Sequence, residues 1–187
     1  MKLIKCLGTA AVVLAICLIL SGGGYEECDI GEVPMQLHTV EVEDIPPYEY
    51  VFYDVPLTED QQREIQIYAH LNCVPYEIVL GVMKAESGFR ADVIGDSGDS
   101  LGIMQVQPKW HTWRLEETGG TDWFDAVDNA KVGIHILSEK LQKYGSVEKA
   151  LVVYNMGDGG AKGIESTAYS QRVLSYAEVL LDERCAM

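Results

Sequence analysis

Basic residues are scarce in this sequence. Its 187 residues include 14 Lys and Arg against 29 Asp and Glu, so the formal net charge at pH 7 is -15. Nucleic acids and anionic membrane surfaces are bound mainly through clustered Lys and Arg. The composition therefore argues against both as the main partner. It fits a protein that acts on a neutral polymer, although solubility alone is the simpler explanation of the charge.

Cysteine and histidine are too few and too scattered for a disulfide scaffold or a metal site. After the first 24 residues only Cys28, Cys73 and Cys185 remain, an odd number that permits at most one internal disulfide. Cys73 stands in an apolar helical context and is interpreted as a small buried residue, whereas Cys28 could pair with Cys185. The four histidines share no metal-ligand spacing. They are His38, His70, His111 and His135. We expect no metal and no cofactor.

Long apolar runs are absent except at the start of the chain. Lys2 and Lys5 precede a stretch without charge, residues 6–20, and small residues follow at 21–24. This layout is typical of a secretory signal peptide, and the run is shorter than the ~20 residues of a full membrane span. We expect residues 1–24 to be a signal peptide or an N-terminal membrane anchor. The remaining chain would then lie outside the cytoplasm, secreted or anchored to the outer face of the membrane.

A second segment contains no basic residue at all. Residues 25–60 hold eleven Asp or Glu and four prolines. Like charges repel and proline interrupts helices, so residues 25–57 are predicted to be an extended acidic linker. A weak strand over residues 49–55 is the alternative.

Helical signals begin at Thr58, and residues 58–187 are predicted to form one mostly helical domain. Thr58 and Gln61 form a capping box, and Pro75 suits the first turn of a second helix. Short helical signals cover residues 109–117. Asp125, Ser146 and Thr167 are the predicted caps of three later helices. A short β-hairpin within residues 87–101 would make the fold α+β.

The second helix ends on a carboxylate. Its apolar residues include Val82 and Met83, and Glu86 follows at the spacing of the same face. Burial and the helix dipole both disfavour a negative charge at that position, so both raise the pKa of Glu86. Such a residue is a candidate general acid. The polar loop 87–101 and the pair Tyr154-Asn155 could converge on it. An acid, an amide and a phenol around a groove suit a sugar substrate.

Three segments carry a family resemblance. In chain order they are Glu86-Ser-Gly-Phe89, Gly102-Ile-Met-Gln105 and Ala150-Leu-Val-Val-Tyr-Asn-Met-Gly157. They resemble the motifs of soluble-lytic-transglycosylase-type domains, and Asn129 to Gly133 and Tyr169 to Val173 resemble two further segments of that family. The resemblance covers residues 58–173. Any one motif is weak evidence, but all of them in order form a specific signal.

The resemblance implies a lysozyme-like fold, predominantly α-helical, with a hairpin or loop flanking the active-site cleft. It also implies cleavage of the β-1,4 bond between N-acetylmuramic acid and N-acetylglucosamine in peptidoglycan. Glu86 would first protonate the glycosidic oxygen and then, as a base, take the proton of the sugar's own 6-hydroxyl. The product would be a 1,6-anhydro sugar. One enzymic carboxylate is enough because the substrate's N-acetyl group can stabilise the cation, whereas ordinary glycoside hydrolysis uses two.

Asp96 departs from the transglycosylase pattern, which usually has Ser at this place. The segment Gly95-Asp-Ser-Gly98 resembles goose-type lysozymes instead, which release sugars by hydrolysis. The hypothesis is that Asp96 positions a water or supports the cation and so favours hydrolysis. The alternative is that Asp96 only caps the loop.

The other motif residues have a functional and a structural interpretation each. Ser87 is expected to steady the carboxylate, or else to end the helix. Gln105 is expected to bind substrate through its amide, or else to bond a helix end. Met104 packs, or forms the floor of the groove. Tyr154 is expected to neighbour the acid, with Asn155 beside it. Tyr169 lines the cleft or fills the core. Asp92 and Asp99 are expected to be turn residues. Trp110, Trp113 and Trp123 are not assigned to the site.

Two other classes of function remain open at this stage. One is a non-catalytic glycan-binding module at the cell surface, although a binder has no need of a buried acid. The other is an interaction protein whose acidic linker recruits partners. We expect a monomer whose partner is the glycan strands of peptidoglycan.

Overall fold

The computed structural model describes residues 50–186. Its helices are α2 (Glu59–Leu71), α3 (Tyr76–Glu86), α4 (Pro108–Glu117), α5 (Ala126–Tyr144), α6 (Val147–Gly160) and α7 (Ala168–Ala186). A two-stranded antiparallel sheet is formed by β1 (Ile94–Gly95) and β2 (Ser100–Leu101), with the short 3-10 helix η3 (Asp96–Gly98) between them. In the register Ile94 faces Leu101 and Gly95 faces Ser100. The prediction of a predominantly α-helical α+β fold with a short hairpin is confirmed.

The helices begin and end where the local sequence predicts. The capping box is present, because Gln61 N–H donates to the Thr58 hydroxyl and the Gln61 side chain accepts from the Thr58 backbone. Asp125 caps α5, and Ser146 caps α6. Gly145 ends α5 with a φ of 65°, in the left-handed region that favours glycine. Each cap satisfies backbone groups that would otherwise lack a partner.

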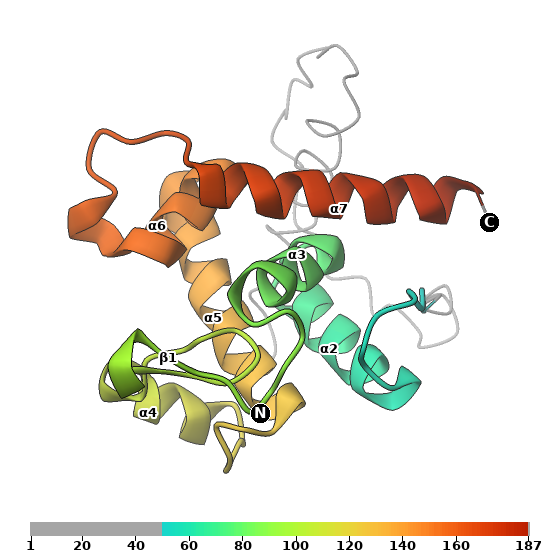
Figure 1. Ribbon diagram of the computed structural model, residues 1–187, viewed down its shortest axis with the longest axis horizontal. Coiled ribbons are helices and arrows are strands. Elements are labelled where there is room, and N and C mark those ends of the chain that lie inside the picture. The colour runs from blue at the N-terminus through green and yellow to red at the C-terminus, as the bar shows by residue number, and fades with distance from the viewer. Residues whose placement is uncertain (1–49, 187) are drawn as a thin grey trace, which may run out of the picture.

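The helices pack around α3 and α5. Figure 1 shows α7 crossing the top of the molecule above α3, with α2 on one side and α5 passing behind. The core is continuous across these helices and the Gly102–Val106 segment. Its residues that are at most 1% exposed include Ile65, Val79, Met83, Ile103, Met104, Ile134, Leu137, Leu151 and Val173. This packing brings the end of α3, the hairpin and the start of α7 together.

The packed domain begins earlier than the predicted boundary at residue 58. Residues 50–57 form no strand, yet Tyr53 is buried against the core. Two buried glutamines of α2 bond the backbone of this segment, Gln62 at Tyr53 and Gln66 at Val51. Each amide accepts from the backbone N–H and donates to the carbonyl of the same residue, as the backbone of a neighbouring strand would. The last part of the predicted linker therefore lies against the domain.

Several expectations fall on residues that the structure does not describe. The signal segment 1–24, the acidic residues 25–49 and Cys28 lie outside the described range. Cys73 is half-buried rather than buried. Between residues 50 and 186, none of the helices is both long enough and apolar enough to cross a bilayer.

Candidate active site

Glu86 is the last residue of α3, and its carboxylate lies against α7. Tyr169 donates a hydrogen bond of 2.7 Å from its hydroxyl to Glu86 Oε1. Burial raises the pKa of the Glu86 carboxyl, and the nearby charge of Asp96 raises it further, while the bond from Tyr169 and the charge of Arg172 act in the opposite direction. Burial is the largest of these effects, so the acid holds its proton to a higher pH than an exposed Glu. The predicted direction of the shift agrees with this geometry.

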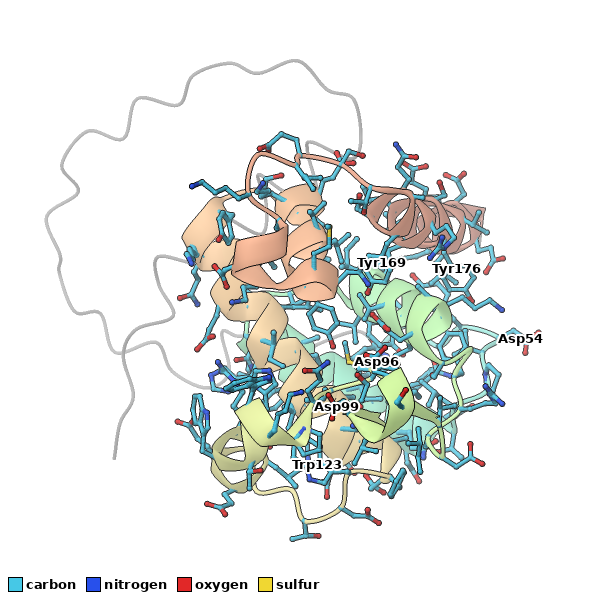
Figure 2. The ribbon with its side chains drawn as sticks, turned by 60° about the vertical axis from the view of Figure 1, so that its left-hand side comes forward. Asp54, Asp96, Asp99, Trp123, Tyr169 and Tyr176 are labelled. Atoms are coloured by element: carbon cyan, nitrogen blue, oxygen red, sulfur yellow. The ribbon has the colours of Figure 1, made fainter. Side chains whose placement is uncertain are left out.

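Two tyrosines lie near Glu86, and only one of them bonds its carboxylate. Tyr154 lines the same cavity as Glu86 and is influenced by its charge, as predicted, while its hydroxyl donates to the Met104 carbonyl at 2.9 Å. Tyr169, for which a core role was equally open, contacts the carboxylate. Figure 2 shows Tyr169 above Asp96, and both act on Glu86, Tyr169 through its hydrogen bond and Asp96 through its charge. The acid is therefore held between α7 and the hairpin.

Ser87 joins α3 to the motif that follows. Its hydroxyl lies 2.8 Å from the Ile103 carbonyl and 3.2 Å from the Met83 carbonyl, and it donates to both. Ser87 was expected to steady the Glu86 carboxylate or else to end the helix, and its hydroxyl bonds carbonyl groups rather than that carboxylate. Ser87 ends the helix and fixes the position of the Gly102–Gln105 segment instead.

Met104 is a packing residue. Its side chain is fully buried, so it forms no floor of the cleft. Its backbone N–H donates to Asn129 Oδ1 at 2.9 Å, while Asn129 Nδ2 donates to the carbonyls of Leu101 and Trp123 at 3.0 Å each. A Cβ on Gly102 would lie 2.3 Å from Asn129 Nδ2, which explains the glycine. Asn129 thus fastens this segment to α5.

The hairpin holds Asp96 in an unusual backbone conformation. Asp96 has a φ of 47° and Ser97 a φ of 58°, a left-handed pair that L-residues adopt at a cost of about 1 kcal/mol or more each. Asp96 Oδ2 accepts a bond of 2.5 Å from the Ser100 hydroxyl. Gln105, with a φ of 50°, donates its amide to the carbonyls of Val93 and Gly102. The side chains of Asp96 and Gln105 line the same cavity.

A cavity of about 600 Å³ lies beside Glu86. Of the predicted site residues, five line it and three do not. The lining ones are Glu86, Asp96, Gln105, Tyr154 and Asn155, and the others are Ser87, Met104 and Tyr169. Sequence reasoning missed the wall formed by α4 and α5. Its residues include Gln107, Trp110, His111 and Lys140.

The site offers polar groups and one half-buried acid. Among residues 50–186, no three His, Cys, Asp or Glu side chains gather closely enough to hold a metal ion. Asp99, expected at a turn, forms an exposed ion pair with Lys109 instead of reaching the cavity, with 2.6 Å between Oδ2 and Nζ. A protonated carboxyl facing an open polar cavity can donate a proton to a bound ether or glycosidic oxygen.

Comparison with known proteins agrees with this arrangement. A family model described as "Transglycosylase SLT domain" matches residues 64–173. The chain belongs to this family, within the lysozyme-like superfamily. A protein of Enterobacteria phage PRD1 named "Transglycosylase" is 29% identical over 104 residues. The aligned part is 55% of this chain and 37% of that protein, so the chain spans little more than a third of its relative's length.

Proposed function

We propose that this protein is a lytic transglycosylase that cleaves the β-1,4 bond between N-acetylmuramic acid and N-acetylglucosamine in peptidoglycan. The observation that carries the proposal is Glu86, a half-buried carboxyl with a raised pKa at the wall of a polar cavity. Membership of the SLT family and the name of the phage relative support the same reaction. An acid that keeps its proton is what the first step of glycosidic cleavage needs.

The reaction uses Glu86 twice. Its proton moves to the glycosidic oxygen as the bond from that oxygen to C1 of the muramic acid breaks, and the N-acetyl carbonyl of the same sugar supports the cation. The Glu86 carboxylate then takes the proton of the 6-hydroxyl, whose oxygen bonds to C1. The acid is regenerated, no water is consumed and the new chain end is a 1,6-anhydro sugar.

Hydrolysis of the same bond is the second candidate, because Asp96 lines the same cavity and influences the pKa of Glu86. In that mechanism Asp96 would position a water or support the cation. A second carboxylate is the usual requirement of a hydrolytic glycosidase. Asp96 also accepts the Ser100 hydroxyl within the hairpin, which is the contact of a loop-capping residue.

The test incubates the full-length chain with isolated peptidoglycan and analyses the released sugars by mass spectrometry. We expect products one water lighter than simple muropeptides. Glu86→Gln should lower the rate by about 100-fold or more, because an amide cannot donate the proton. Reducing-end products that become rarer in Asp96→Asn would favour the hydrolase. If the wild-type chain co-sediments with peptidoglycan and releases nothing, it is a binding module and the proposal is wrong.

The N-terminal segment 1–24 is proposed to serve location rather than chemistry. Peptidoglycan lies outside the cytoplasm, and residues 1–24 have the sequence layout of an export signal or anchor. Fractionation of the producing cells should place the protein outside the cytoplasm. We propose no nucleic-acid partner, because the protein has a net charge of -15 and would repel a polyanion.

A further inference from the structure

His111 lines the same cavity as Glu86, on the wall formed by α4. It is half-buried, and the proposed proton transfers do not use it. Its ring is held by a neighbour on the same helix, since Arg114 Nε lies 3.2 Å from His111 Nδ1. This contact determines which ring nitrogen carries the proton.

Arg114 is itself fixed on three sides. It is 7% exposed, and its Nη2 lies 2.5 Å from Glu139 Oε2 on α5. Its guanidinium stands over the Trp113 ring at 4.3 Å from the centroid. A guanidinium donates hydrogen bonds and cannot accept them, so Nδ1 of His111 must be the acceptor. A neutral imidazole has one N–H, which is then on Nε2.

Within residues 50–186 the Nε2–H of His111 has no hydrogen-bond partner, and the nitrogen is not sealed from solvent. Three charged groups surround the ring, namely Arg114 on α4 and Lys140 and Glu139 on α5. Burial together with the two cations lowers the pKa of His111 to about 4, against the opposing effect of Glu139. The ring is therefore uncharged from about pH 5 upward.

We propose that the Nε2–H of His111 is a fixed, uncharged donor that binds a neutral oxygen of a saccharide in the cleft, with preference for the carbonyl of an N-acetyl group. The inference rests on the proposed function only for the class of ligand. An uncharged donor loses less hydration on binding than an imidazolium would. Arg114 is a positioning residue here, because it orients His111 and does not reach the ligand.

The first experiment observes the ring directly by ¹⁵N NMR of the full-length chain, with His111→Gln used to assign its signals. We expect the Nε2–H tautomer, unchanged between pH 5 and 8. An Nδ1–H tautomer, or titration near the ordinary His value of ~6.5, overturns the inference. This result does not depend on whether the protein cleaves peptidoglycan.

The second experiment compares Gln with Asn at position 111, because their side-chain amides differ in length. The side-chain nitrogen of Gln reaches about as far as Nε2, whereas that of Asn reaches only as far as Nδ1. His111→Gln should keep KM within about threefold, and His111→Asn and His111→Ala should raise it about tenfold with little change in kcat. His70→Ala, on the exposed side of α2, is the control and should behave as wild type.

The variants also separate the inference from the proposed function. In a Glu86→Gln background, calorimetry should rank the affinities of the His111 variants for a β-1,4 tetramer of N-acetylglucosamine in the order that their KM values predict. The glucose tetramer should bind more weakly than this tetramer. Equal affinity of the three His111 variants and their parent overturns the role of His111 while leaving cleavage by the wild type intact. Absence of cleavage by the wild-type chain contradicts the proposed function instead.

Discussion

Tyr169 contributes to the site through its hydroxyl, which stabilises the charged form of Glu86. Removing this bond in Tyr169→Phe should raise the pKa of Glu86 further. In the proposed reaction Glu86 is protonated at the start, so activity is expected to be lost as pH rises through this pKa. We therefore expect the alkaline limb of the pH–rate profile to move to higher pH in the variant. The maximal rate should fall about tenfold because the carboxyl loses its orientation.

Tyr176→Phe is the matched control for this experiment. Tyr176 is also on α7, but its ring packs near Phe89 at 6.3 Å between centroids and is not a neighbour of the acid. Its pH profile should match that of the wild type. An alkaline limb that stays in place in Tyr169→Phe would mean that a group other than Glu86 controls it.

At this scale the sequence predicted the acid but not its partner. Glu86 was found because the spacing of Val82 and Met83 and the end of a helix are local features. The partner depends on how α7 packs on α3, a contact between residues 83 positions apart. Either tyrosine motif was compatible with that contact. His111 was missed for the same reason, since nothing adjacent in the sequence directs α4 to the cleft.

Between elements, α5 packs closely against the segment that leads into the cleft. A Cβ on Gly133 would lie 2.4 Å from Met104 Sδ and 2.7 Å from Met104 Cε. Met104 is fully buried, and its Cβ would also lie only 3.1 Å from the added Cβ. Gly133→Ala should therefore lower the free energy of unfolding by about 1–3 kcal/mol, measured by urea denaturation.

Gly159→Ala tests whether that loss is steric. Gly159 lies in α6, and a Cβ there would meet nothing within 4 Å. Alanine at this position should leave the stability unchanged or raise it by up to about 1 kcal/mol. Equal destabilisation by both substitutions would contradict the packing argument. Activity should also fall in Gly133→Ala, because Met104 and Gln105 share one turn.

The helices themselves were predictable because their determinants are short-range. Thr58, Asp125 and Ser146 each cap a helix at the predicted residue. The segment 102–107 is less regular, a run of turns with one bridge between Leu101 and Val106. Its shape follows from the bonds to Asn129 and Ser87, which no local pattern of residues reveals.

For the molecule as a whole, residues 50–57 contribute to the stability of the folded domain. Tyr53 is buried, and its hydroxyl donates to Glu77 Oε1 at 2.7 Å. A chain that begins at residue 58 loses these contacts and leaves the glutamines of α2 without their backbone partners. We expect it to unfold about 2–4 kcal/mol more easily than a chain that begins at residue 50.

Denaturant unfolding of the two shortened chains measures this difference. The chain from residue 50 should retain the activity of the full-length protein. Identical midpoints for both would mean that residues 50–57 contribute no net stability. The sequence could not predict this contact because the acidic, proline-rich composition before residue 58 is that of a linker. The residues that bond Tyr53, Gln62 and Glu77, are brought beside it only when the domain folds.

The place where the chain joins the domain has a consequence for how the enzyme could work on a surface. Residues 50–57 run beside α2, whereas β1, α4 and the end of α6 lie on the opposite flank (Figure 1). The walls of the cavity come from that opposite flank. A tether that reaches the domain at residue 50 would therefore leave the flank formed by β1, α4 and the end of α6 uncovered.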